Sequence, residues 1–150
     1  MKKLILLCLL SLVAFGLKAQ TLEQTTEFIE TTIAPYSVGD TYISFHPDSI
    51  KYSNNTTTHR QPNIQSIKYN NIKSITHSKD KIGDGTEYIW IDIVGRVTFF
   101  SGYDNTYTNQ THFSIRINDN TPIPIVEKLI KAIKHAAELQ GAKLVNENMF

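Results

Sequence analysis

The feature that most constrains the fold is the amphipathic pattern of residues 122–140, which read PIPIVEKLIKAIKHAAELQ. Apolar residues recur there at spacings of three and four, which is typical of a helix with one broad apolar side. These residues are Val126, Leu129, Ile130, Ile133, Ala136 and Ala137. Thr121 can cap this helix, and Gly141 can end it in the left-handed conformation. The apolar side needs a partner, so we expect the helix to close a body made of strands.

The body is predicted from the alternation of polar and apolar residues before this helix, which places apolar side chains on one face of each strand. Asn70-Asn71 and Gly95-Arg96 have residue types that favour tight turns, so each pair is expected to reverse the chain. The expected strands are 41–46, 49–53, 64–69, 72–77, 86–94, 97–100 and 111–117. Seven such antiparallel strands curl into a sandwich or a partly open barrel, which the terminal helix would cap.

A second, shorter helix is expected at residues 21–34. Thr21 and Gln24 have the spacing of a capping box, and Pro35 ends the helical pattern. The predicted fold class is therefore α+β and mainly β: a short N-terminal helix, a seven-stranded antiparallel barrel or sandwich and a capping C-terminal helix. Its size suits a single domain over residues 20–150.

Residues 1–19 have the organisation of a secretory signal peptide. Lys2 and Lys3 precede an apolar run that is short for a membrane span, and the small residue Ala19 closes it. Cleavage near Ala19 would release the domain into the periplasm or outside the cell. An uncleaved anchor is the alternative interpretation. Because the apolar run is short and terminal, we expect no integral membrane domain. The only cysteine, Cys8, lies in this segment, so we expect no disulfide in the remaining chain.

The charge of the chain argues against nucleic acid as a partner. Loss of Lys2, Lys3 and Lys18 lowers the 15 basic residues to 12, against 14 acidic residues. A protein that binds nucleic acid without sequence preference needs a basic stripe, and this slightly acidic sequence has none. The expected partner is therefore a protein or a small ligand.

The arrangement resembles the pleckstrin-homology-like fold, in which seven strands form a barrel and a C-terminal helix caps it. The segments that carry the likeness are IQSIKYNNIKSITHS, EYIWIDIVGRVTFF and HFSIRIN followed by TPIPIVEKLIKAIKHAAEL. The sequence is also similar to small exported proteins of Bacteroidetes, which have a short helix before such a barrel and often end in phenylalanine, as Phe150 does here. The resemblance covers most of residues 21–150 and implies the fold alone.

Two functional motifs were compared with these families. Pleckstrin-homology domains that bind inositol phosphates carry several basic residues in the first hairpin, whereas this hairpin has only Lys51, so phosphoinositide binding is not expected. Asp48-Ser49-Ile50 is similar to the short O-glycosylation motif of exported Bacteroidetes proteins. The simpler interpretation is that Ser49 helps to turn the hairpin.

Catalytic patterns are missing from the sequence, so we expect a non-catalytic binding or interaction module without a cofactor or a metal. The five histidines lack metal-ligand spacing, and no nucleophile elbow is present. One alternative is a small periplasmic hydrolase with a site formed by His112, Arg116 and the loop from Tyr103 to Tyr107. Another is a carrier that holds a small apolar ligand or lipid between the strands and the closing helix.

The candidate binding surface is formed by Tyr88, Trp90 and Asp92, which alternate with the apolar residues of the strongest predicted strand. Large aromatic side chains on an outer face often mark a contact site. The competing interpretation is that the N-terminal helix covers this face, because its own apolar side also needs a partner. We favour the covered arrangement at this stage.

Overall fold

The computed structural model describes residues 21–38, 41–54 and 62–145. The expected signal peptide, its cleavage site near Ala19 and the single cysteine lie outside the described residues. Nothing in the structure therefore tests these three expectations.

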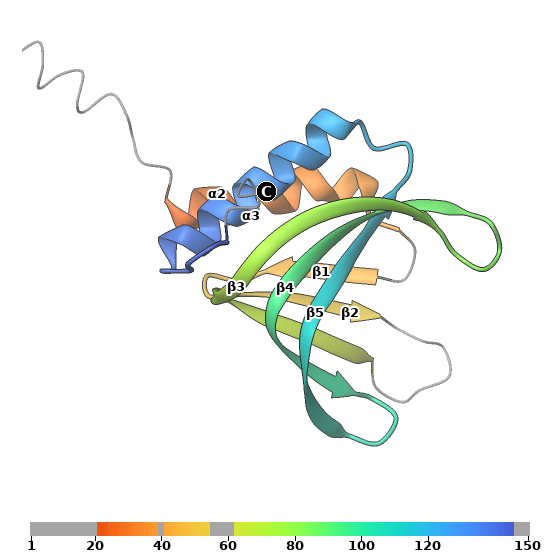
Figure 1. Cartoon of the computed structure of the whole chain (residues 1–150), viewed down its shortest axis with the longest axis horizontal. Coiled ribbons are helices and arrows are strands. Elements are labelled where there is room, and N and C mark those ends of the chain that lie inside the picture. Colours follow the sequence, from red (N-terminus) through yellow and green to blue (C-terminus); the bar gives the residue numbers. More distant parts are fainter. Residues whose placement is uncertain (1–20, 39–40, 55–61, 146–150) are drawn as a thin grey trace, which may run out of the picture.

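The fold is α+β and mainly β, as the sequence predicts. One antiparallel sheet has its five strands in the order of the chain, β1 to β5, and two helices lie together at one end of it (Figure 1). The elements are α2 (Leu22–Ile33), the 3-10 turn η1 (Ala34–Tyr36), β1 (Thr41–Phe45), β2 (Ser49–Asn54), β3 (Asn63–Lys81), β4 (Glu87–Ser101), β5 (Thr106–Asn118) and α3 (Ile123–Leu139).

The prediction of seven strands was wrong, because two expected turns lie inside long strands. Asn70-Asn71 falls within the 19 residues of β3, and Gly95-Arg96 falls within the 15 residues of β4. The pairing between β3 and β4 shifts register on both sides of Ile72, and the pairing of β4 with β5 shifts between Val94 and Val97. Extra residues are thus absorbed as bulges, which bend a strand without ending its pairing.

The bend also explains the glycine in β4. A Cβ atom at Gly95 would overlap the carbonyl oxygen of Asn71 and the side chain of Ile67. Only glycine therefore lets the two bulged strands approach this closely.

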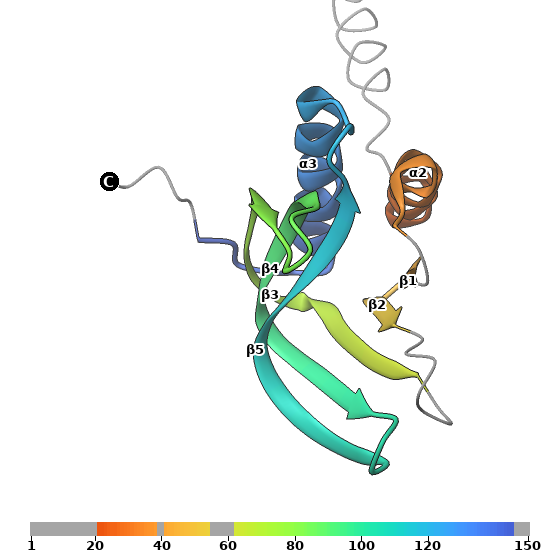
Figure 2. The same cartoon turned by 90° about the vertical axis from the view of Figure 1, so that its right-hand side faces the viewer.

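The sheet is open, so the predicted barrel is not supported. β1 and β5 are the two ends of the strand order, and no pairing joins them in the part of the chain that the structure describes. Figure 2 shows the sheet curling around, with α2 and α3 beside each other at one end and the β4–β5 turn extending away at the other. The curled sheet is therefore left open between its two end strands, β1 and β5.

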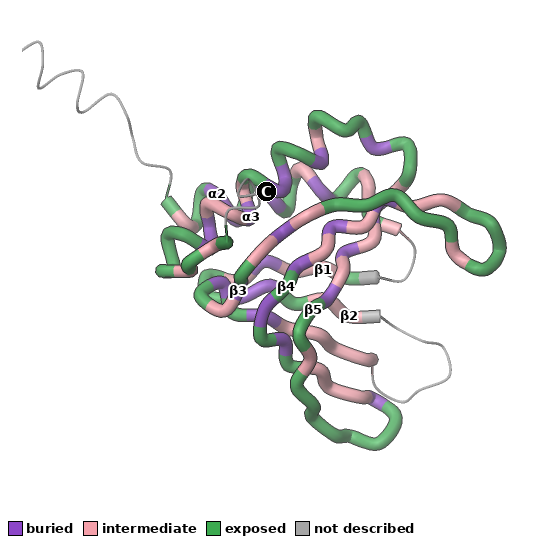
Figure 3. Tube along the Cα trace, viewed as in Figure 1, coloured by how far each residue is buried: buried purple, intermediate pink, exposed green. Residues whose placement is uncertain are grey.

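The hydrophobic core lies between the sheet and the two helices, as Figure 3 shows in purple. The apolar residues of β4 alternate inward, and Ile91 pairs with Ile115 of β5 at 0% exposure for both. The apolar side of α3 is buried as well, and its main contacts are with α2 and β3. The expectation that this helix closes the strand body is therefore confirmed.

The helix ends agree with the sequence except at one position. The capping box between Thr21 and Gln24 is present, and Gly141 has a φ of +81° after α3. Thr121 does not cap α3, because Pro122 occupies the N-cap. The Thr121 hydroxyl instead donates to the carbonyl oxygen of Asn118 at 2.6 Å, which stabilises the turn before the helix.

Candidate functional site

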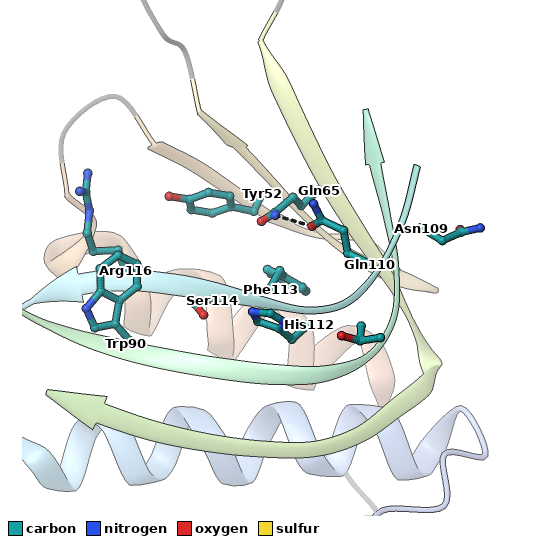
Figure 4. Close-up of a pocket in the computed structure, with 10 residues that line it drawn as sticks. Tyr52, Gln65, Trp90, Asn109, Gln110, His112, Phe113, Ser114 and Arg116 are labelled. Atoms are coloured by element: carbon teal, nitrogen blue, oxygen red, sulfur yellow. Dashed lines mark hydrogen bonds between the residues drawn. The ribbon is translucent and has the colours of Figure 1, made fainter. Parts of the chain in front are cut away.

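A surface groove of about 710 Å³ lies on the open side of the curled sheet (Figure 4). Its walls come from strands that are not neighbours in the sheet, since β2 and β3 face β5 across it. The lining residues are Tyr52 from β2, Gln65 from β3, Trp90 from β4, and Asn109, Gln110, Thr111, His112, Phe113, Ser114 and Arg116 from β5. The side chains are mostly uncharged and polar, with the three large aromatic rings of Tyr52, Trp90 and Phe113 and one arginine.

The groove runs along the backbone edge of β5. Six consecutive residues of this strand, 109–114, line it. Successive side chains of a strand point to opposite faces, so a hollow lined by all six lies beside the strand edge and not over one face. β5 ends the strand order, and the side of residues 109–114 that faces away from β4 pairs with no described strand. Backbone donors and acceptors are therefore available in the groove.

This edge lacks the usual protection against strand addition. Residues 109–114 read NQTHFS and contain no lysine, no acidic residue and no proline. The part of β3 beyond its pairing with β2 is different, because it carries Lys73, Lys79 and Lys81. Exposed charges, lysine above all, are a common means of keeping other strands away from an edge. The contrast indicates that the edge of β5 is able to accept a strand.

One contact already shows this edge accepting a partner. Ser37, which follows η1, forms an isolated antiparallel bridge with Ile117 near the end of β5. The bridge occupies the edge beside the last residues of the strand. It leaves residues 109–114 open, so the groove has a closed end near Ile117 and an open end near Asn109.

A hydrogen bond connects the opposite walls of the groove, and Tyr52 extends from one wall toward the other. The side-chain nitrogen of Gln65 donates to the side-chain oxygen of Gln110 at 3.0 Å, across the intervening strand β4. Tyr52 projects over the groove with its hydroxyl toward the end where Arg116 lies (Figure 4). Burial raises the pKa of Tyr52, and the charge of Arg116 partly opposes this shift. The Tyr52 hydroxyl therefore stays protonated at neutral pH and can donate a hydrogen bond to a ligand.

Among the described residues that line the groove, Arg116 is the only lysine, arginine, aspartate or glutamate. Its guanidinium carbon lies 4.8 Å from the centre of the Tyr88 ring, so the side chain is held by a cation–π contact. Its Nε atom is buried and has no hydrogen-bond partner among the described residues. The terminal nitrogens of the guanidinium likewise form no hydrogen bond or ion pair with a described residue, so they can donate to an acceptor that comes from outside the described chain.

The structure separates the three residues of the candidate binding surface. Trp90 lines the groove, whereas the Tyr88 ring contacts the guanidinium of Arg116. Asp92 accepts hydrogen bonds from the hydroxyls of Ser78 and Ser114, which join it to both neighbouring strands. Trp90 is thus placed to contact a ligand directly, whereas Tyr88 and Asp92 are placed to position other side chains. Their role in binding remains a prediction.

The favoured interpretation of this face was wrong. α2 does not cover Tyr88 and Trp90, because its main contacts are with α3 and β1. The apolar side of α2 instead enters the core, where Ile29 is fully buried. The sequence shows that this helix needs a partner, but it does not show that α3 supplies one.

The hydrolase site is only partly assembled. His112 and Arg116 both line the groove, whereas Tyr103, in the β4–β5 turn, is 79% exposed and Tyr107, at the start of β5, is 73% exposed. Ser114 also lines the groove, but its hydroxyl donates to Asp92 and not to His112. A serine hydrolase needs the histidine between the serine and the carboxylate, so this arrangement does not activate Ser114.

Two other expectations can be compared with the structure. Ser49 is buried, and its hydroxyl donates to the Asp48 carboxylate at 2.8 Å, so it is not presented at the surface for glycosylation. An apolar ligand between the sheet and the closing helix would need space where Ile91, Ile115 and Leu129 have 0% exposure and belong to one packed cluster. This packing argues against the carrier alternative.

Comparison of the chain with protein-family models, with curated proteins and with solved structures finds no match. Within residues 21–38, 41–54 and 62–145, no helix has the length and apolar character to cross a membrane. The same residues contain no group of three or more histidine, cysteine, aspartate or glutamate side chains that could hold a metal ion.

Proposed function

We propose that this protein is a non-catalytic module that binds an extended segment of a partner polypeptide by strand addition along β5. The observation that carries the proposal is the run of six lining residues, 109–114, beside a free strand edge. In this mode of recognition, backbone hydrogen bonds to the edge supply affinity, and pockets for alternate side chains supply specificity.

The composition of the groove supports a peptide in preference to an apolar ligand. The half-buried rings of Tyr52 and Trp90 offer flat contact area with little entropy to lose, as in many protein-binding sites, whereas the Phe113 ring is buried. The amides of Gln65 and Gln110 can bond to peptide groups in either direction, because an amide has both donors and an acceptor. Export to the periplasm or the outside of the cell, and the pleckstrin-homology-like resemblance, remain predictions that accompany this proposal.

Selection from a display library of random short peptides tests the proposal. The purified protein is expected to enrich a family of sequences, and hydrogen exchange of residues 109–114 is expected to slow when a selected peptide binds. Truncation of a central aromatic residue typically costs 1 kcal/mol or more, which is about fivefold in affinity. Tyr52→Ala should weaken binding by at least about this factor.

Tyr42→Ala is the matched control, because Tyr42 lies on the adjacent strand β1, is 67% exposed and does not line the groove. Its affinity for the peptide should equal that of the unchanged protein. A second copy of the chain is the other candidate occupant of the edge. The proposal is overturned if sedimentation shows a dimer whose contact protects residues 109–114, or if no peptide family is enriched.

A further inference from the structure

From the position of Arg116, and resting on the proposed function, we infer that the docked segment carries an acidic side chain that pairs with this arginine. Apart from Arg116, the described residues that line the groove include no lysine, arginine, aspartate or glutamate, so Arg116 is the fixed charge that a ligand meets there. The inference concerns the chemistry of the partner and is separate from whether a strand docks at all.

The guanidinium is oriented but lacks an acceptor. Its central carbon lies 4.8 Å from the centre of the Tyr88 ring, and a guanidinium held over an aromatic ring can still donate N–H bonds in its own plane. No described residue forms an ion pair with Arg116, and its buried Nε has no partner. A carboxylate has two oxygens that can accept two parallel N–H bonds from one guanidinium. It is therefore the acceptor that matches the Arg116 side chain best.

The nearby carboxylates do not take this role. Asp92 lies on the same strand as the Tyr88 ring, but its oxygens accept from Ser78 and Ser114. Asp84, in the turn between β3 and β4, has its pKa lowered chiefly by hydrogen bonds from Thr86 and only weakly by the charge of Arg116. The missing acceptor is therefore expected from the partner.

The direction of the docked segment indicates where its acidic residue lies. The existing bridge between Ser37 and Ile117 is antiparallel. A strand that pairs with residues 109–114 in the same sense begins near Ser114 and runs toward Asn109. Its N-terminal end then lies beside Arg116, and its C-terminal carboxylate lies at the other end of the groove. The carboxylate that reaches Arg116 therefore belongs to an aspartate or glutamate side chain near the start of the segment.

Two display formats distinguish the sources of the carboxylate. In the first, the random peptides are joined to the coat protein through their C-terminus and have no free carboxylate there. In the second, the C-terminus is free. We expect enrichment of aspartate or glutamate near the start of the peptides in both formats. Enrichment only in the second format, without an acidic residue, would assign Arg116 to a C-terminal carboxylate and overturn the inference.

Binding of a selected peptide is then measured by fluorescence anisotropy. A hydrogen-bonded pair with a charged group contributes about 1.5–3 kcal/mol, so Arg116→Gln should weaken binding about 10- to 100-fold. Arg116→Lys keeps the positive charge but cannot donate two parallel N–H bonds. Its affinity for the peptide should therefore lie between those of Arg116→Gln and the unchanged protein. Arg96→Gln is the matched control, because Arg96 is exposed on β4 and does not line the groove.

A peptide change tests the same pair without altering the protein. Replacing the acidic residue of the peptide by its amide should weaken binding to the unchanged protein and have little effect with Arg116→Gln, since the two changes remove one interaction. The inference is overturned if the losses of binding free energy from the peptide change and from Arg116→Gln simply add up. Peptides that bind the groove without an acidic preference would also overturn it while leaving the proposed function intact, whereas the absence of any binding peptide would overturn the proposed function itself.

Discussion

Replacement of Tyr69 by phenylalanine tests the packing of the core at a polar atom that has no partner. The Tyr69 side chain, on β3, is fully buried at 0% exposure, and its hydroxyl oxygen makes no hydrogen bond to a described residue. Burial of a hydroxyl without a partner costs roughly 1–3 kcal/mol. Tyr69→Phe removes the hydroxyl and keeps the ring. The substitution therefore removes the cost of burying the hydroxyl and leaves no large cavity in the core.

We therefore expect Tyr69→Phe to raise the free energy of unfolding by about 1 kcal/mol, at the low end of this range. Urea denaturation followed by circular dichroism measures the change, and the slope of the transition should be unchanged. Tyr42→Phe is the control, because Tyr42 is 67% exposed and should give no change. A loss of 1 kcal/mol or more in Tyr69→Phe would refute the reasoning, since it would mean that the hydroxyl is satisfied in the folded protein.

The same residue predicts a dependence on alkaline pH. Burial raises the pKa of Tyr69, and the negative charges of Glu30 and Asp48 raise it further. The folded state thus favours the neutral phenol, and this contribution to stability is complete below the unfolded pKa of about 10. It is lost as the pH rises from there toward the higher folded pKa. Urea unfolding from pH 9 upward should show a steeper loss for the unchanged protein than for Tyr69→Phe.

Two further substitutions test local geometry by the same urea assay. Gly95→Ala should lower the free energy of unfolding by at least about 1–3 kcal/mol, because its Cβ would overlap the carbonyl oxygen of Asn71. Gly83→Ala has open space around it and should change little; equal effects of the two changes would contradict the bulge geometry. Thr21→Ala removes the capping box of α2 and should cost about 1 kcal/mol. Thr31→Ala, at an exposed position inside the helix, should cost less.

The groove shows which parts of a binding site local sequence can predict. Trp90 was found because it alternates with buried isoleucines, a pattern that any half-buried strand displays. Its partners Tyr52 and Gln65 could not be found in this way, since they lie on strands that reach β5 only through the curl of the sheet. The signal that could have indicated the edge is the uncharged sequence of residues 109–114, which contrasts with the lysines of β3.

The two helices, their apolar sides, the faces of the strands and the mainly β class are all predictable from local sequence. These features depend on periodicity and on end signals such as Thr21 and Gly141, which act over a few residues. Long-range pairing, in contrast, makes the Asn70-Asn71 and Gly95-Arg96 pairs bend strands instead of ending them. Turns and bulges use the same residue types, and the choice between them depends on pairing with distant strands. The number of strands, the open edge of β5 and the groove follow from that choice.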